Sequence, residues 1–202
     1  MPMASEPGKF ERYYEAVAET PPRPSLLKAL QLFQAEGRGA GTAADLGCGS
    51  GTDTVELLRR GWRVIAIDKE MSALGRLQAR LDLPAEPMLA LRCERFEEAD
   101  WGMVDLVNAS FALPLVERAL FPQLWRRVTD SLSPGGRFAG QLYGPRDGWA
   151  EHPGLTVLTR AEIEALATDF AVEELDEIER DGETAIGKAK HWHYFNLVLR
   201  RR

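Results

Sequence analysis

The fold of this chain is decided by the stretch Asp45-Leu46-Gly47-Cys48-Gly49-Ser50-Gly51, a Gly-x-Gly-x-Gly turn that follows an apolar run. Residues 42–46 have the length and apolarity of a buried strand, and residues 52–60 have the apolar spacing of a helix. A glycine turn between a strand and a helix places backbone N–H groups and a helix N-terminus against a ligand. Glycine suits this turn because a Cβ would block the ligand or the turn itself.

Strands and helices alternate along the chain on either side of this turn. Helices are expected over 25–36, 72–81, 121–132 and 160–168, and strands over 62–67, 88–93, 106–109 and 137–143. This alternation predicts an α/β fold with a parallel sheet and helices on both faces. The last two extended runs, 170–178 and 191–199, are joined through Arg180-Asp181-Gly182 with no room for a crossover helix, so they must be antiparallel.

Composition narrows the class of protein. The 202 residues fit one domain, or one domain with an N-terminal extension. A formal net charge of -6 disfavours nucleic acid as the main partner, because an acidic surface repels phosphates. The two cysteines show no metal-ligand spacing, which predicts no metal site and reduced thiols in the cytoplasm. No signal core and no bilayer-length apolar run occur, so no membrane association is expected.

Two acids near the glycine turn indicate what the ligand carries. Asp45 lies two residues before Gly47, where a dinucleotide pyrophosphate would repel a carboxylate but a cationic amine or sulfonium would accept one. The spacing also differs from the Gly-x-Gly-x-x-Gly of hydride-transfer enzymes. Asp68 ends the next strand, 17 residues after Gly51, and suits the two hydroxyls of a ribose.

With these motifs in place, the sequence resembles the class I S-adenosylmethionine-dependent methyltransferases. The stretch from Asp105 to Phe111 resembles their fourth-strand motif, and Ser131 to Gly136 resembles the turn before their fifth strand. The likeness covers roughly residues 25 to 200. It implies a Rossmann-like, seven-stranded sheet of order 3-2-1-4-5-7-6 with the last strand antiparallel. A looser likeness to the tellurite-resistance type rests on Phe111-Ala112-Leu113-Pro114 and on the tail from Gly182 to His193.

The resemblance implies S-adenosylmethionine as cofactor and S-adenosylhomocysteine as product. The third-strand stretch departs from the family's acid-led motif, and Glu94, followed by Arg95, replaces it there. A helical extension over 1–24 would act as a lid on the domain 25–202 and contribute Tyr14. The expected cofactor-binding residues are Asp45, Gly47, Cys48, Gly49, Gly51, Asp68, Glu94, Arg95, Asn108, Phe111 and Tyr14.

The acceptor is expected at the carboxyl ends of the strands, where open parallel sheets bind their ligands. The loop after the fifth strand and the C-terminal hairpin loop, 181–190, should open there, which predicts substrate contacts from Tyr143, Arg146, Trp149 and Lys190. His191 is the candidate general base, because imidazole titrates near neutral pH.

The expected activity is methyl transfer to a small-molecule acceptor by in-line displacement, in a monomer or homodimer. Two alternatives stay open. One is a catalytically silent module that binds S-adenosylmethionine, because no residue stands out as the acceptor-side base. The other is an NAD-dependent Rossmann oxidoreductase, against which Asp45 and the glycine spacing argue.

Overall fold

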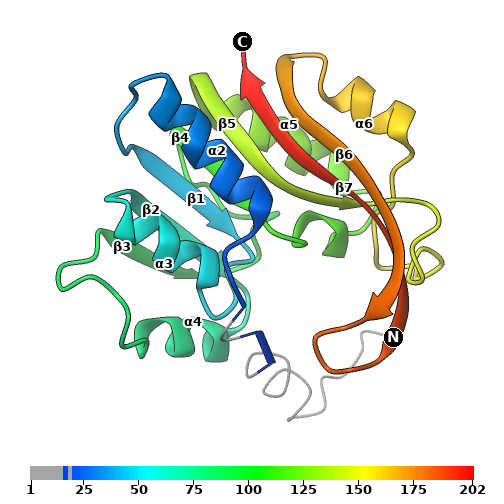
Figure 1. Ribbon diagram of the computed structural model, residues 1–202, viewed down its shortest axis with the longest axis horizontal. Coiled ribbons are helices and arrows are strands. Elements are labelled where there is room, and N and C mark those ends of the chain that lie inside the picture. The colour runs from blue at the N-terminus through cyan, green and yellow to red at the C-terminus, as the bar shows by residue number, and fades with distance from the viewer. Residues whose placement is uncertain (1–15, 18–19) are drawn as a thin grey trace.

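The structure of this protein is a computed structural model that describes residues 16–17 and 20–202. Its centre is a seven-stranded sheet of order β3-β2-β1-β4-β5-β7-β6, as predicted (Figure 1). The strands are β1 (Thr42–Leu46), β2 (Arg63–Asp68), β3 (Leu89–Cys93), β4 (Val104–Ala109), β5 (Leu132–Tyr143), β6 (Phe170–Glu183) and β7 (Ala189–Arg201). The helices are α2 (Pro24–Ala35), α3 (Thr52–Arg59), α4 (Met71–Gln78), α5 (Phe121–Ser131) and α6 (Arg160–Leu166), with a 3-10 turn η1 (Leu113–Leu115).

Helices cover both faces of the sheet. On one face, α2, α3 and α4 bury side chains such as Phe33, Leu57 and Leu77 against the strands. On the other face, α5 and α6 bury Trp125 and Ile163. Figure 1 shows α2 and α3 in front of the sheet and α5 behind it. Because the inner strands are covered on both sides, most of their residues are apolar and do not alternate with polar ones, which is what made these strands recognisable in the sequence.

The C-terminal hairpin supplies the antiparallel part of the sheet. Strand β7 pairs antiparallel with both β5 and β6. Both hairpin strands are longer than predicted, so residues 184–188 form the turn in place of the expected loop 181–190. Within the predicted turn at Ser133 to Gly136, Gly135 has a φ of 74°, although β5 already begins at Leu132. That residue pairs with Val104, and a register shift follows it.

The parallel register brings the polar ends of three strands together. Asp45 in β1 lies beside Asn108 in β4 and opposite Ala66 in β2, which ends at Asp68. The chain before α2 passes close to this edge (Figure 1). Tyr14 and most of the proposed extension lie outside the described residues. Within the part of the chain that the structure describes, no helix is both long and apolar enough to cross a membrane.

Candidate active site

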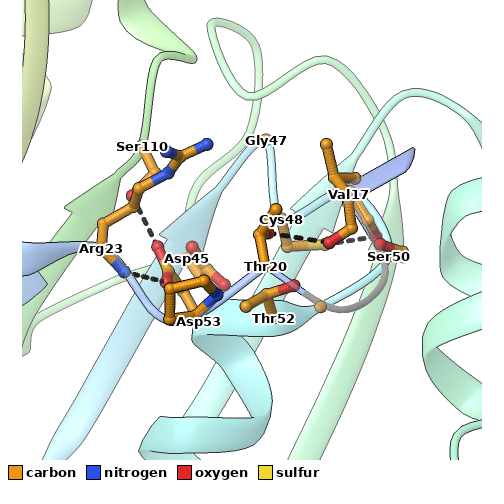
Figure 2. Close-up of a pocket in the computed structure, with 13 residues that line it drawn as sticks. Val17, Thr20, Arg23, Asp45, Gly47, Cys48, Ser50, Thr52, Asp53 and Ser110 are labelled. Atoms are coloured by element: carbon orange, nitrogen blue, oxygen red, sulfur yellow. Dashed lines mark hydrogen bonds between the residues drawn. The ribbon is translucent and has the colours of Figure 1, made fainter. Parts of the chain in front are cut away.

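A pocket lies over the glycine turn, at the carboxyl ends of β1 and β4 (Figure 2). Gly47 and Gly51 have φ values of 67° and 85°, which side-chain-bearing residues rarely adopt. A Cβ on Gly47 would lie 2.6 Å from Cβ of Ala112, and one on Gly51 would lie 2.2 Å from Cδ1 of Leu77. The floor of the pocket is therefore bare backbone. The lining residues are Val17, Thr20, Pro21, Arg23, Asp45, Gly47, Cys48, Gly49, Ser50, Gly51, Thr52, Asp53 and Ser110.

Two buried carboxylates, those of Asp45 and Asp53, form one wall of this pocket. Nδ2 of Asn108 donates to both, over 2.9 Å to Oδ1 of Asp45 and 3.1 Å to Oδ2 of Asp53. The hydroxyl of Thr54 donates to Asp45, and that of Ser110 donates to Asp53, each over 2.5 Å. These donors are all neutral. Among the described residues, neither carboxylate has an ion-pair partner, so the wall is negative and uncompensated.

The surroundings of this wall shift the pKa values of two of its groups, Asp45 and the neighbouring Cys48. Burial raises the pKa of Asp45 to about 7, and the neighbouring Asp53 carboxylate adds to the rise. Burial also raises the pKa of the Cys48 thiol well above its usual range, with Asp45 contributing. Cys48 is therefore a neutral lining group, and ionisation of Asp45 is costly until a cation arrives. The pocket favours a positively charged ligand.

Asp53 also fastens the segment before α2 to the pocket. Its Oδ1 accepts a hydrogen bond of 2.9 Å from the backbone nitrogen of Arg23, the N-cap residue of α2. Pro24, which has no N–H group, opens the helix. Ser25 is fully buried in the first turn, where its Oγ accepts from Nε2 of Gln141 over 2.8 Å.

Asp68 lies at the end of β2, and its side chain is hydrogen-bonded to the glycine turn. Its Oδ2 accepts from the backbone nitrogen of Gly49, and its Oδ1 from that of Glu70, each over 2.9 Å. Glu94 lies next to it, since its backbone nitrogen donates to the carbonyl oxygen of Asp68 over 3.2 Å. Arg95 is exposed and pairs with neighbouring glutamates. None of Asp68, Glu94 and Arg95 lines the pocket, so their predicted cofactor contacts stay predictions.

The residue after Ser110 leads from the pocket into a group of rings. Phe111 has a φ of 54°, which makes it the one residue other than glycine with a positive φ in the described part of the chain. Such backbone strain persists where the surroundings hold it and is frequent at functional sites. Here it orients a ring that contacts Tyr143, Trp192 and Tyr194 at centroid distances of 5.0 to 5.9 Å. With Trp149, which contacts Tyr143 and Trp192, these residues form the aromatic cluster.

A buried lysine lies inside the aromatic cluster. Nζ of Lys190 is 3.6, 3.7 and 4.4 Å from the ring centroids of Trp149, Trp192 and Tyr143. It is also 2.9 Å from Oδ1 of Asp147, an ion pair that lacks hydrogen-bond geometry, and both side chains are fully buried. Burial lowers the pKa of Lys190, whereas Asp147 raises it. Three ring faces and a carboxylate stabilise the ammonium form, so the cluster has a cationic centre.

Comparison with known proteins fits this geometry. Residues 43–136 match the family model described as "Methyltransferase domain". This range includes the glycine turn, Asp45, Asp68 and β4. Residues 43–136 are therefore similar to a methyltransferase domain. No curated protein matches the sequence.

Solved structures share the fold of this chain at low identity. TehB from Haemophilus influenzae is 14% identical with a TM-score of 0.76, over 94% of this chain and 66% of TehB, so this chain spans slightly less than two thirds of that protein. A 1,6-didemethyltoxoflavin-N1-methyltransferase from Burkholderia thailandensis is 22% identical with a TM-score of 0.64, over 88% and 78% of the chains. Magnesium protoporphyrin IX methyltransferase from Synechocystis is 14% identical with a TM-score of 0.68, over 96% and 91%.

Of the four predicted substrate residues, the structure brings Tyr143, Trp149 and Lys190 together but leaves Arg146 apart, and the candidate base His191 also lies outside this group. Arg146 pairs with Glu177 and Glu179 of β6, and these bonds raise its pKa. The ring of His191 bonds Asp181 over 2.7 Å and Glu179 over 3.2 Å. Successive side chains of a strand point to opposite faces, so His191 lies across β7 from Lys190.

The catalytic role predicted for His191 therefore requires its ring to leave both acids. Those hydrogen bonds, with Asp181 first, raise the pKa of His191, which favours the imidazolium over the neutral base. Sequence reasoning also missed four residues that the structure brings to the pocket or to the aromatic cluster. These are Arg23, Asp53, Trp192 and Tyr194.

Proposed function

We propose that this domain transfers a methyl group from S-adenosylmethionine to a small-molecule acceptor that docks on the aromatic cluster. The observation that carries the proposal is the pair of buried carboxylates, Asp45 and Asp53, which only neutral donors contact in the described structure. A ligand with an ammonium and a sulfonium would supply the missing positive charge.

The residues present fit that ligand. The bare backbone at Gly47 and Gly51 leaves room for a nucleoside close to the turn, where a Cβ would clash. Oδ1 of Asn108 is buried without a donor in the described structure, which leaves one acceptor beside the two carboxylates. Asp68, at the end of β2, is our candidate for the ribose hydroxyls. Similar folds have been solved with S-adenosylmethionine or S-adenosylhomocysteine bound, which supports the choice of cofactor.

In this reaction the residues of the chain would position the two reactants and exclude water. When bound, S-adenosylmethionine supplies an electrophilic methyl group on a sulfonium. Ser110 lines the pocket and the next residue, Phe111, belongs to the aromatic cluster, so an acceptor on the cluster would lie beside the pocket. Holding two reactants in line contributes roughly 7 to 11 kcal/mol in favourable cases. Ring faces also suit a reaction that disperses positive charge.

The acceptor side offers a cationic centre and no free base. Lys190 lies under Trp149 and Trp192, and its charge is partly balanced by Asp147. This arrangement favours a small, unsaturated acceptor whose nucleophilic atom is neutral or anionic, since a cation would be repelled. An acceptor that is already deprotonated needs no catalytic base.

Transfer of radiolabel tests the activity directly. Purified protein is incubated with methyl-tritiated S-adenosylmethionine and a fractionated metabolite extract, with Asp45→Asn protein as the matched control. We expect label in a small-molecule fraction with the wild-type protein and a large reduction with the variant. If the wild-type protein binds S-adenosylhomocysteine but transfers no label to any fraction, the silent binding module is the better account.

A further inference from the structure

The loop after β5, residues 144–149, stays hydrogen-bonded to β7 beyond the point where the pairing of β5 with β7 ends. Its first residue, Gly144, donates its N–H to the carbonyl oxygen of His193 over 2.8 Å. The loop carries Asp147, which pairs with the buried lysine, and Trp149, which belongs to the aromatic cluster. The position of this loop therefore determines how the proposed acceptor side is assembled.

His193 contacts the loop through its ring as well as its backbone. Its backbone nitrogen donates to Oδ2 of Asp147 over 3.1 Å, and its ring nitrogen Nδ1 accepts from the backbone nitrogen of Arg146 over 3.0 Å. The side chain is only 1% exposed. A Cβ on Gly144 would lie 2.2 Å from the ring, so the loop backbone packs directly against the imidazole.

These hydrogen bonds require one tautomer of the His193 ring. Nδ1 faces an N–H donor, so it must have a free lone pair. The hydrogen of the neutral ring is then on Nε2, which lies 2.9 Å from Oε1 of Glu177. This bond, together with one from Arg146, lowers the pKa of Glu177, so the acceptor is an ionised carboxylate at neutral pH. The neutral ring therefore satisfies both of its nitrogens.

Charged groups of both signs surround this ring, and they do not decide its protonation by themselves. On the Nε2 side the carboxylate of Glu177 favours an imidazolium, whereas Nη2 of Arg146, 3.1 Å from Nε2, opposes one. The Nδ1 side has no such balance, because a protonated ring would point a second N–H at the N–H of Arg146. The charged residues around the ring are Arg146 and Asp147 of the loop, Glu177 and Glu179 of β6, Arg160 of α6 and Lys190 of β7.

We infer that His193 is a positioning residue of the acceptor side, whose neutral ring holds loop 144–149 against β7 and whose protonation releases it. The inference rests on the proposed function, because the loop matters there as the carrier of Asp147 and Trp149. Imidazole takes up a proton on the acid side of neutral pH. Protonation replaces an N–H to nitrogen hydrogen bond with two opposed N–H groups, so the loop must move. Methyl transfer then falls in acid for a reason separate from cofactor binding.

An asparagine at this position separates the hydrogen bond from the titration. In His193→Asn the amide oxygen can take the place of Nδ1 and accept from Arg146, but it takes up no proton. His193→Phe keeps a planar ring and has no acceptor. The matched control is His152→Asn, because Nδ1 of His152 also accepts a backbone N–H, that of Gly154 over 3.2 Å, but in an exposed loop.

Hydrogen exchange of the Arg146 amide, followed by NMR, tests the inference without any acceptor. Its protection factor in the wild-type protein and in His152→Asn should fall about tenfold between pH 7.5 and 5.5, the size of one lost hydrogen bond. In His193→Asn it should stay constant within about twofold. Constant protection in the wild type, or an equal fall in His193→Asn, would overturn the inference.

The tritium assay then asks whether the loop matters for transfer, with the extract fraction that the wild-type protein labels as acceptor and saturating S-adenosylmethionine at each pH. His193→Phe should be about tenfold slower at pH 7.5 with its cofactor Kd within about twofold of wild type. His193→Asn should stay within about threefold at pH 7.5 and lose about tenfold less than the wild type by pH 5.5.

An equally steep acid loss in His193→Asn would show that the ring is only structural and would overturn the inference. Because Asp45 is unchanged in all of these proteins, its titration cancels in the comparison. Wild-type protein that labels no fraction at any pH would overturn the proposed function instead, and exchange of the Arg146 amide would still decide the role of the His193 ring.

Discussion

Nδ2 of Asn108 lies 2.9 Å from Oδ1 of Asp45, and this hydrogen bond joins β4 to β1 directly under the pocket. The same nitrogen reaches Asp53, so one amide holds two carboxylates together. Ligand charge is the simplest compensation for such an arrangement, because no described residue forms an ion pair with either carboxylate. The pH dependence of binding follows from it.

Cofactor binding should release a proton below neutral pH. Burial and Asp53 raise the pKa of Asp45 to about 7, so this carboxyl is largely protonated in the free protein at pH 6. A cationic ligand favours the ionised form, and affinity for S-adenosylhomocysteine should fall up to about tenfold per pH unit from pH 7 to 5.5. Calorimetry in buffers of different ionisation enthalpy should report a proton released at pH 6 and almost none at pH 8. Proton uptake at pH 6 would contradict this account of Asp45.

The same titration should affect the stability of the free protein. Because the folded-state pKa of Asp45 lies above the ordinary value of 3.8, the folded state between about pH 4 and 7 holds a proton that the unfolded state has lost. The free energy of unfolding should therefore lose this contribution as pH rises to 7, and level off above it. Asp45→Asn should remove that slope. Urea unfolding from pH 5 to 8 should show the free energy of unfolding of the variant rising relative to that of the wild type. A difference between the two proteins that does not change with pH would argue against a raised pKa of Asp45.

Replacing Gly47 should damage the pocket more than replacing a glycine in open space. Gly47→Ala puts a Cβ 2.6 Å from Cβ of Ala112, a methyl group that cannot rotate away. Gly37 has a similar φ, 69° against 67°, but nothing lies within 4 Å of its would-be Cβ. Gly37→Ala should therefore show backbone strain alone, about 1 to 3 kcal/mol of unfolding free energy. Gly47→Ala should cost more and abolish cofactor binding, and equal effects at both sites would show that the close approach is unimportant.

The lysine inside the aromatic cluster should be essential for stability. Lys190→Met leaves the buried carboxylate of Asp147 without its cation, and breaking a buried pair in this way costs about 3 to 5 kcal/mol. The double variant with Asp147→Asn should recover part of that loss. Lys188→Met is the control, because Lys188 is exposed in the same hairpin. Urea unfolding measures all three, and a Lys190→Met protein as stable as the control would mean that the pair contributes nothing.

The sheet order and the cofactor loop were accessible from sequence because short-range patterns determine them. The glycine turn and the apolar strands constrain the chain locally, and the last two extended runs are too close in sequence for a crossover helix between them. The site was harder to predict, because it depends on the face of the strand to which each side chain points. Lys190 and His191 were both predicted at the acceptor, but adjacent residues of a strand point to opposite faces, so only one could reach it.

Two site residues gave no usable signal in sequence. Asp53 is an acid in the first turn of a helix, which is a common stabilising position, and only the folded chain shows its bonds to Asn108 and Arg23. Arg23 lies in a proline-rich segment whose path across the pocket depends on a contact 30 residues away. Long-range contacts of this kind are not encoded in local periodicity.

The most direct test of the central claim is a calorimetric titration of the purified protein at pH 7.5 with S-adenosylhomocysteine, and separately with NADH. The carboxylate wall of Asp45 and Asp53 predicts saturable one-site binding of S-adenosylhomocysteine, whose ammonium it can neutralise, and no binding of NADH, whose pyrophosphate it repels. Saturable binding of NADH with no heat from S-adenosylhomocysteine would contradict the account.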